Sequence, residues 1–128
     1  MAEGKFGTLI NCIDGRTIIP AVTWLKEKYH LDFIDTVTEP GIDKIVSNKD
    51  NEKTAQIKTK VLISKRAHGS SLIAIAGHHG CAGNPVSKEE HIEQIKKSID
   101  TIKSWNYESK IVGIWINEKW QVEQVNSS

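Results

Sequence analysis

Cysteine is scarce in this sequence, and its scarcity excludes one class of small protein. Only two cysteines occur among the 128 residues, at positions 12 and 81. Small secreted domains that depend on disulfides carry more cysteines, because they lack a core large enough to fold without them. A chain of this length can bury a sizeable core. We therefore expect a single domain over residues 1–128, with cysteines that serve as metal ligands or reactive thiols.

Long hydrophobic runs and an excess of either charge are also missing. The 17 Lys and Arg residues nearly balance the 16 Asp and Glu residues. This balance argues against binding nucleic acids or membrane surfaces through bulk charge. No apolar stretch is long enough to cross a bilayer, and the segment MAEGKFGT has no apolar region of the secretory type. We expect a cytoplasmic protein that binds neither nucleic acid nor membrane.

Five short segments rich in apolar and β-branched residues have the character of β-strands. They occupy residues 6–12, 32–38, 71–77, 110–116 and 120–125. The third, SLIAIAG, is almost entirely apolar, as is typical of the centre of a parallel sheet. A short turn at Asn117 separates the last two segments, which predicts an antiparallel hairpin at an edge.

Segments with helical spacing of apolar residues lie between these strands. The first begins near Pro20, the second spans residues 54–67, and the third follows Ser87. The third carries one apolar stripe, formed by Ile92, Ile95, Ile99 and Ile102. Residues 47–53 are polar and predict a loop. The alternation predicts a three-layer α/β fold, with a mostly parallel sheet of four strands plus an antiparallel edge strand.

Candidate metal ligands follow the first and third predicted strands. Cys12 ends the first strand, and His78 and Cys81 lie in a glycine-rich loop after the third. Sites in open parallel sheets form beyond the carboxyl ends of the strands, so these side chains converge if the two strands are neighbours. Two thiolates and one imidazole suit tetrahedral zinc, which keeps a fourth position open in catalytic sites. The spacing alone leaves His79 as an alternative to His78.

Asp14 and Arg16 form a Cys-x-Asp-x-Arg motif with the first candidate ligand. In an extended segment, alternation would place all three side chains on one side. We expect Arg16 to hold the Asp14 carboxylate in a bidentate contact that keeps it ionised beside the metal. Alternatively, Asp14 binds the zinc itself and closes the site.

The two motifs together resemble those of the β-class carbonic anhydrases. That family has Cys-x-Asp-x-Arg followed by Gly-His-x-x-Cys, matched here by CIDGR at 12–16 and GHHGC at 77–81. The resemblance implies a zinc ion (Zn2+) on Cys12, His78 and Cys81. It implies reversible hydration of carbon dioxide to bicarbonate by zinc-bound hydroxide, with Asp14 and Arg16 acting at the fourth position. It also implies a homodimer or a higher homo-oligomer.

Some family features have no match in this sequence. The usual Arg-Asn-Ala-Gly stretch after the second strand is replaced by TVTEPGIDK, and Ala82 stands where glycine is usual. Two alternatives therefore stay open on the same metal site: a hydrolase of carbon disulfide or carbonyl sulfide, and a zinc-binding homologue without activity. A thiol redox module using both cysteines is a further hypothesis. The other histidines are expected at helix ends or on the surface and receive no role: His30, His68 and His91.

Overall fold

The computed structural model describes residues 3–126. The strands are β1 (Phe6–Asn11), β2 (Phe33–Thr38), β3 (Leu72–His78), β4 (Lys110–Ile116) and β5 (Val122–Val125). The helices are α1 (Ile18–Tyr29), α2 (Ile42–Val46), α3 (Glu52–His68) and α4 (Lys88–Lys103). Within the described residues, no helix combines the length and apolar character that a membrane span requires.

The five strands form one sheet in the order β2-β1-β3-β4-β5. The first four strands are parallel, and β5 pairs antiparallel with β4, which confirms the predicted α/β fold class. The chain passes from β1 to β2 on one side and then returns to β3 on the other side of β1. The carboxyl ends of β1 and β3 therefore flank the point where the winding reverses, which is where sites form in such sheets.

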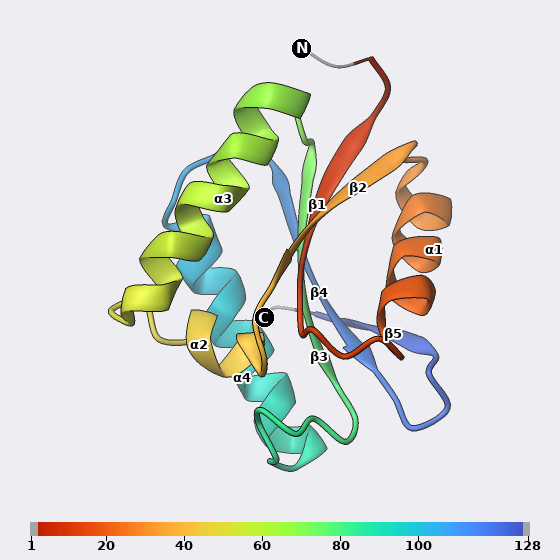
Figure 1. The fold of residues 1–128 in the computed structure, drawn as a ribbon, viewed down its shortest axis with the longest axis vertical. Coiled ribbons are helices and arrows are strands. Elements are labelled where there is room, and N and C mark those ends of the chain that lie inside the picture. Colours follow the sequence, from red (N-terminus) through yellow and green to blue (C-terminus); the bar gives the residue numbers. More distant parts are fainter. Residues whose placement is uncertain (1–2, 127–128) are drawn as a thin grey trace.

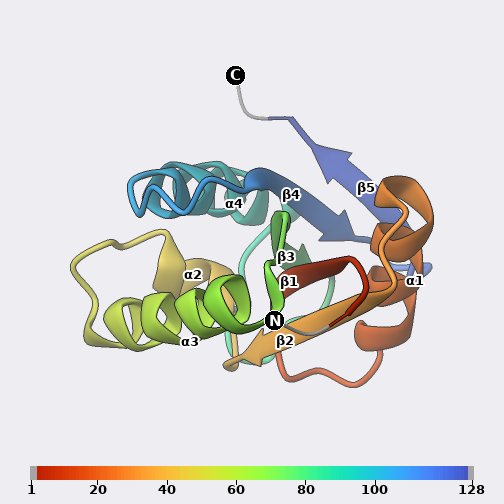
Figure 2. The same ribbon diagram turned by 90° about the horizontal axis from the view of Figure 1, so that it is seen from above.

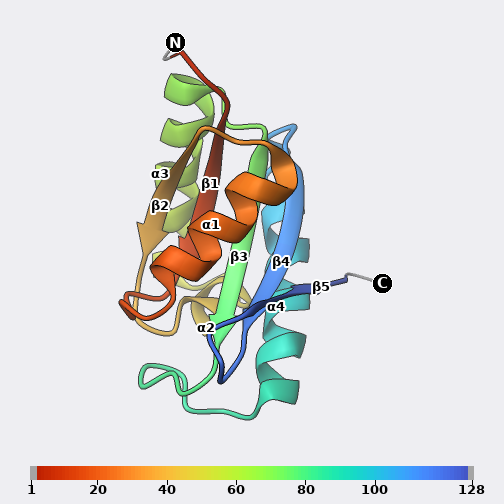
Figure 3. The same cartoon turned by 90° about the vertical axis from the view of Figure 1, so that its right-hand side faces the viewer.

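Helices cover both faces of the sheet, which confirms the three layers (Figures 1 and 2). Figure 3 shows α1 in front of the sheet, with α3 and α4 behind it. One apolar core lies between the sheet and α2, α3 and α4, and it includes Ile75 and Ile99. A second core lies under α1 and includes Leu25 and Ala74. Neighbouring residues of β3 enter opposite cores because side chains alternate along a strand.

The short helix α2 was not predicted. Gly41 precedes it with φ of 60°, and a Cβ atom at Gly41 would lie 2.6 Å from the carbonyl oxygen of Gly83. The left-handed backbone and this close approach both favour glycine there.

Two element boundaries also differ from the prediction. Helix α3 begins at Glu52, earlier than expected, because the Asn51 side chain accepts the N–H of Lys53 and caps the helix. The predicted 47–53 loop is therefore shorter. Strand β3 extends through His78, so this candidate ligand ends the strand instead of following it.

Candidate metal centre

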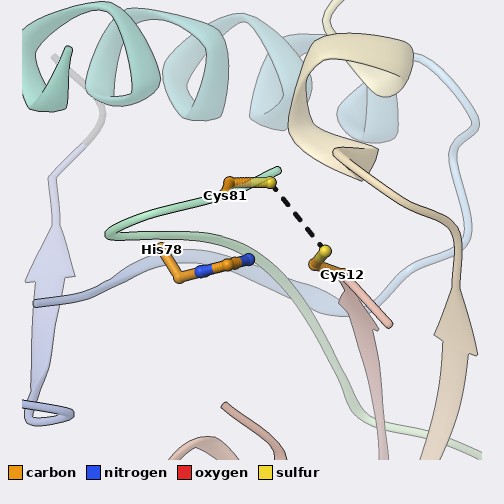
Figure 4. A group of neighbouring side chains, drawn as sticks. All are labelled: Cys12, His78 and Cys81. Atoms are coloured by element: carbon orange, nitrogen blue, oxygen red, sulfur yellow. Dashed lines mark hydrogen bonds between the residues drawn. The ribbon is translucent and has the colours of Figure 1, made fainter. Parts of the chain in front are cut away.

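Three buried side chains converge at the carboxyl ends of β1 and β3: Cys12, His78 and Cys81 (Figure 4). Their possible ligand atoms all lie within 4.8 Å of one another. The two sulfur atoms are 3.9 Å apart, and both thiols are free. Two sulfurs bound to one tetrahedral zinc ion at about 2.3 Å each would be about 3.8 Å apart. The spacing of the thiols therefore fits a shared zinc ion.

The His78 ring is oriented to offer its Nε2 atom. Its Nδ1 lies 2.8 Å from the carbonyl oxygen of His79, so the Nδ1–H donates to that oxygen. Nε2 is then buried with no hydrogen-bond partner among residues 3–126. An unpaired buried nitrogen costs free energy, whereas a metal-binding histidine commonly donates its other ring N–H to a carbonyl. This orphaned atom fits metal binding, and it favours His78 over the exposed His79 as the ligand.

The two thiols have opposite pKa shifts. Burial raises the pKa of Cys12, but the His78 side chain and the N–H groups of Gly41 and Asp14 outweigh it and bring the pKa to about 7. Burial and the negative charge of Cys12 raise the pKa of Cys81 to about 11. One thiolate thus forms readily near neutral pH and the second is opposed by the first. A divalent cation would offset the repulsion between two thiolates.

The loop that joins His78, at the end of β3, to Cys81 is short and turns at Gly80. The φ angle of Gly80 is 67°, in the left-handed region that glycine adopts without strain. Beyond Cys81, the N–H of Asn84 donates to the Cys81 carbonyl oxygen at 3.3 Å, and the N–H groups of Gly83 and Asn84 both act to lower the pKa of the Cys81 thiol. This turn therefore brings Cys81 back over the end of β3, where His78 lies.

Asp14 and Arg16 form the bidentate contact that the sequence predicted. Arg16 Nε donates to Asp14 Oδ1 at 3.0 Å, and Nη2 donates to Oδ2 at 2.6 Å. These hydrogen bonds lower the pKa of Asp14 to about 2, against the raising effect of burial. The carboxylate is therefore ionised. Among the described residues, Asp14 is outside the group whose ligand atoms lie within 4.8 Å of one another, so it is held by Arg16 and not in the ligand cluster.

The backbone conformation that brings Asp14 and Arg16 together differs from the prediction. The segment after Cys12 is not extended: the backbone N–H of Arg16 donates to Asp14 Oδ1 at 3.0 Å, which closes a turn. Arg16 also lies over the Trp120 ring, 4.5 Å from its centroid, and Nη2 donates to the Gly80 carbonyl at 3.4 Å. The guanidinium therefore joins the Asp14 turn, the Gly80 turn and the hairpin that leads into β5.

His91 lies at a helix end, as expected, in the first turn of α4, but it is buried and not on the surface. Its side chain is 2% exposed, and its Nδ1 lies 2.5 Å from Oδ2 of the equally buried Asp43. The sequence carried one signal for this burial: His91 precedes Ile95 and Ile99 at helical spacing, on the apolar stripe of α4. Asp43 gave no comparable signal, because it lies in the unpredicted helix α2.

Comparisons with known proteins agree with this geometry. A family model described as "Putative carbonic anhydrase" matches residues 2–126. No protein with a curated description matches the sequence.

Solved β-carbonic anhydrases share the fold. An isoform from Trichomonas vaginalis has a TM-score of 0.65 at 14% identity, covering 94% of this chain and 82% of the other. The Aspergillus fumigatus enzyme has a TM-score of 0.60 at 11% identity, covering 94% of this chain and 76% of the other. A Sordaria macrospora enzyme, described as tetrameric, has a TM-score of 0.54 at 15% identity, covering 93% and 80%. The family match over nearly the whole sequence, together with this shared fold, shows that the chain is a member of the β-carbonic anhydrase family.

Proposed function

We propose that this protein binds one zinc ion through Cys12, His78 and Cys81 and catalyses the reversible hydration of carbon dioxide to bicarbonate. The orphaned Nε2 of His78, buried beside two thiols at the spacing of zinc ligands, carries the proposal. Membership of the carbonic anhydrase family supports the reaction. Zinc bound there would acidify a coordinated water and so supply a nucleophile near neutral pH.

The chain's own residues have two tasks in this proposal. Cys12, His78 and Cys81 would hold the ion, and a tetrahedral zinc would keep one further position for water or substrate. The ionised Asp14 would accept a hydrogen bond from a group held at that position, and Arg16 fixes the orientation of the Asp14 carboxylate through two hydrogen bonds. Arg16 is itself held by Trp120 and the Gly80 carbonyl.

The decisive test combines zinc analysis with stopped-flow carbon dioxide hydration. We expect zinc-dependent activity that falls about 100-fold or more in Asp14→Asn, because this variant keeps the shape of the side chain but loses its charge. Asp100→Asn, a change at an exposed position of α4, is the matched control and should retain activity. Full zinc occupancy without hydration activity would reject the carbon dioxide reaction. Release of sulfide from carbon disulfide or carbonyl sulfide would then identify the alternative hydrolase.

We also propose that two copies of the chain associate next to this site. An apolar groove of about 500 Å³ lies between α1 and the β5 hairpin, and Ile19, Trp24 and Trp120 are among its lining residues. Ile19 and Ile13 are 75% and 62% exposed, and Ile13 is adjacent to Cys12. A second copy that covered this surface would bury these side chains and restrict water near Asp14. Light scattering at micromolar concentration should give a dimer or larger assembly, and Ile19→Glu should weaken it; a monomeric wild type contradicts the proposal.

A further inference from the structure

A second polar cluster is buried behind the candidate ligands, between α2, α4 and the loop that follows Cys81. Asp43 Oδ2 contacts His91 Nδ1 at 2.5 Å, and Asp43 Oδ1 accepts from Asn84 Nδ2 at 3.1 Å. Asn84 Nδ2 also donates to Gln94 Oε1 at 2.6 Å. Asp43, Asn84 and His91 are each no more than 2% exposed. Burying a carboxylate out of contact with water costs free energy, which the surrounding structure must offset. The buried position of Asp43 therefore indicates a specific role.

Asp43 touches the backbone that carries two of the three candidate ligands. A Cβ atom placed on Gly77, the residue before His78, would lie 2.6 Å from Asp43 Oδ2. The carboxylate therefore packs directly against the end of β3. Its other oxygen accepts from Asn84, whose backbone N–H donates to the Cys81 carbonyl oxygen at 3.3 Å.

The N-terminus of α2 also connects Asp43 to Cys12, the third candidate ligand. The N–H of Gly41 faces the Cys12 sulfur, and Gly41 packs against the Gly83 backbone. Asp43 lies in the first turn of the helix that Gly41 begins. Helix α2 thus meets the segments of all three ligands, and α4 holds α2 in place through His91 and through Ser98, whose Oγ donates to the Asp43 carbonyl at 3.2 Å.

We propose that Asp43, together with Asn84 and His91, is a positioning network that sets the geometry of the three zinc ligands. This inference rests on the zinc site of the proposed function and adds residues to which the motifs assign no role. None of the three side chains belongs to the group of candidate ligands. They act through the backbone of β3, through the loop after Cys81 and through the N-terminus of α2. Residues that orient metal ligands in this way typically contribute 10- to 100-fold to metal affinity.

The test measures metal binding independently of turnover. Asp43→Asn keeps the shape of the side chain but removes its charge and one acceptor. Asp35→Asn is the matched control, because Asp35 also contacts a histidine, His68, at 2.6 Å but pairs with Thr8 inside β1 and is not in the ligand cluster. Zinc affinity is measured by competition with a chromophoric chelator. The cobalt(II)-substituted proteins give the ligand geometry through their thiolate charge-transfer and d–d absorption bands.

We expect zinc affinity to fall about 10- to 100-fold in Asp43→Asn, with altered cobalt bands, and to stay unchanged in Asp35→Asn. If Asp43→Asn does not fold, Gln94→Ala removes an outer acceptor from a half-buried position and should shift affinity in the same direction by a smaller factor. Unchanged affinity and cobalt bands in the folded variant would overturn the inference, even if stability fell. A wild type that binds zinc but hydrates no carbon dioxide would reject only the proposed reaction, whereas a wild type that binds no zinc would reject both.

Discussion

Two aspartate–histidine pairs with nearly the same contact distance lie in very different parts of this molecule. Asp43 and His91 are 2.5 Å apart beside the carboxyl end of β3, and each side chain is 2% exposed. Asp35 and His68 are 2.6 Å apart between β2 and the end of α3, with side chains 27% and 35% exposed. The contacts resemble each other, but water reaches only the second pair. Burial, more than distance, decides what each pair does for the protein.

The surroundings of the two pairs differ as well. Asp35 also accepts from Ser64, whose hydroxyl contacts those of Thr8 and Ser70, and His68 stacks on Phe6 at 4.3 Å. Alternative hydrogen-bond partners and solvent are therefore at hand if one member is lost. Asp43 is enclosed by the backbone of β3 and by the loop that follows Cys81. Substituting Asp43 or His91 therefore leaves buried polar atoms unpaired. The comparison predicts unequal responses to matched substitutions.

The largest difference should appear in metal content. Cys81→Ser replaces a thiolate with a hydroxyl that does not ionise near neutral pH, so zinc should fall from about one ion per chain to almost none. His68→Ala at the other pair should keep full zinc. Elemental analysis after gel filtration measures both proteins. Stoichiometric zinc in the Cys81→Ser protein would reject the ligand set.

The next largest difference should appear in stability without metal. Asp43→Asn leaves His91 and Asn84 buried without their charged partner, and should lower the free energy of unfolding by about 3–5 kcal/mol. Asp35→Asn changes a partly exposed contact and should cost about 1 kcal/mol or less. Urea unfolding of both proteins with a chelator present gives the two values. Equal losses would show that burial does not distinguish the pairs.

Two glycines provide a smaller and finer comparison. A Cβ atom on Gly77 would lie 2.6 Å from the Asp43 carboxylate, whereas one on Gly7 would lie 2.8 Å from the terminal methyl of Leu31. Asp43 is fixed by hydrogen bonds, but the Leu31 side chain can rotate. Gly77→Ala should therefore cost about 1–3 kcal/mol and Gly7→Ala less. Urea unfolding compares the stability losses of the two variants. A larger loss in Gly7→Ala would mean that the Asp43 side chain moves aside easily.

Local patterns predicted most of the sheet and the clustering of the three candidate ligands. Strand β4 and the apolar stripe of α4 have strong periodic signals, and Cys12, His78 and Cys81 lie in compact motifs at strand ends. Helix α2 has only five residues and is held by contacts such as that of Gly41 with Gly83. Periodicity cannot reveal so short a helix, because its stability comes from distant segments.

The same limit explains the missed network. His91 and Asp43 are 48 positions apart, and nothing near either residue indicates the other. The turn at Asp14 was missed for a local reason: alternation assumes an extended chain, but the Arg16 N–H bonds back to the Asp14 carboxylate. The predicted ion pair formed even though the backbone path to it differed.

The stacking of Arg16 on Trp120 also has a consequence for the order of events during synthesis. A chain that has been made only as far as α4 already contains every candidate zinc ligand, but it lacks the aromatic ring that supports Arg16. The Asp14–Arg16 pair therefore gains this support only after the hairpin that leads into β5 has been synthesised.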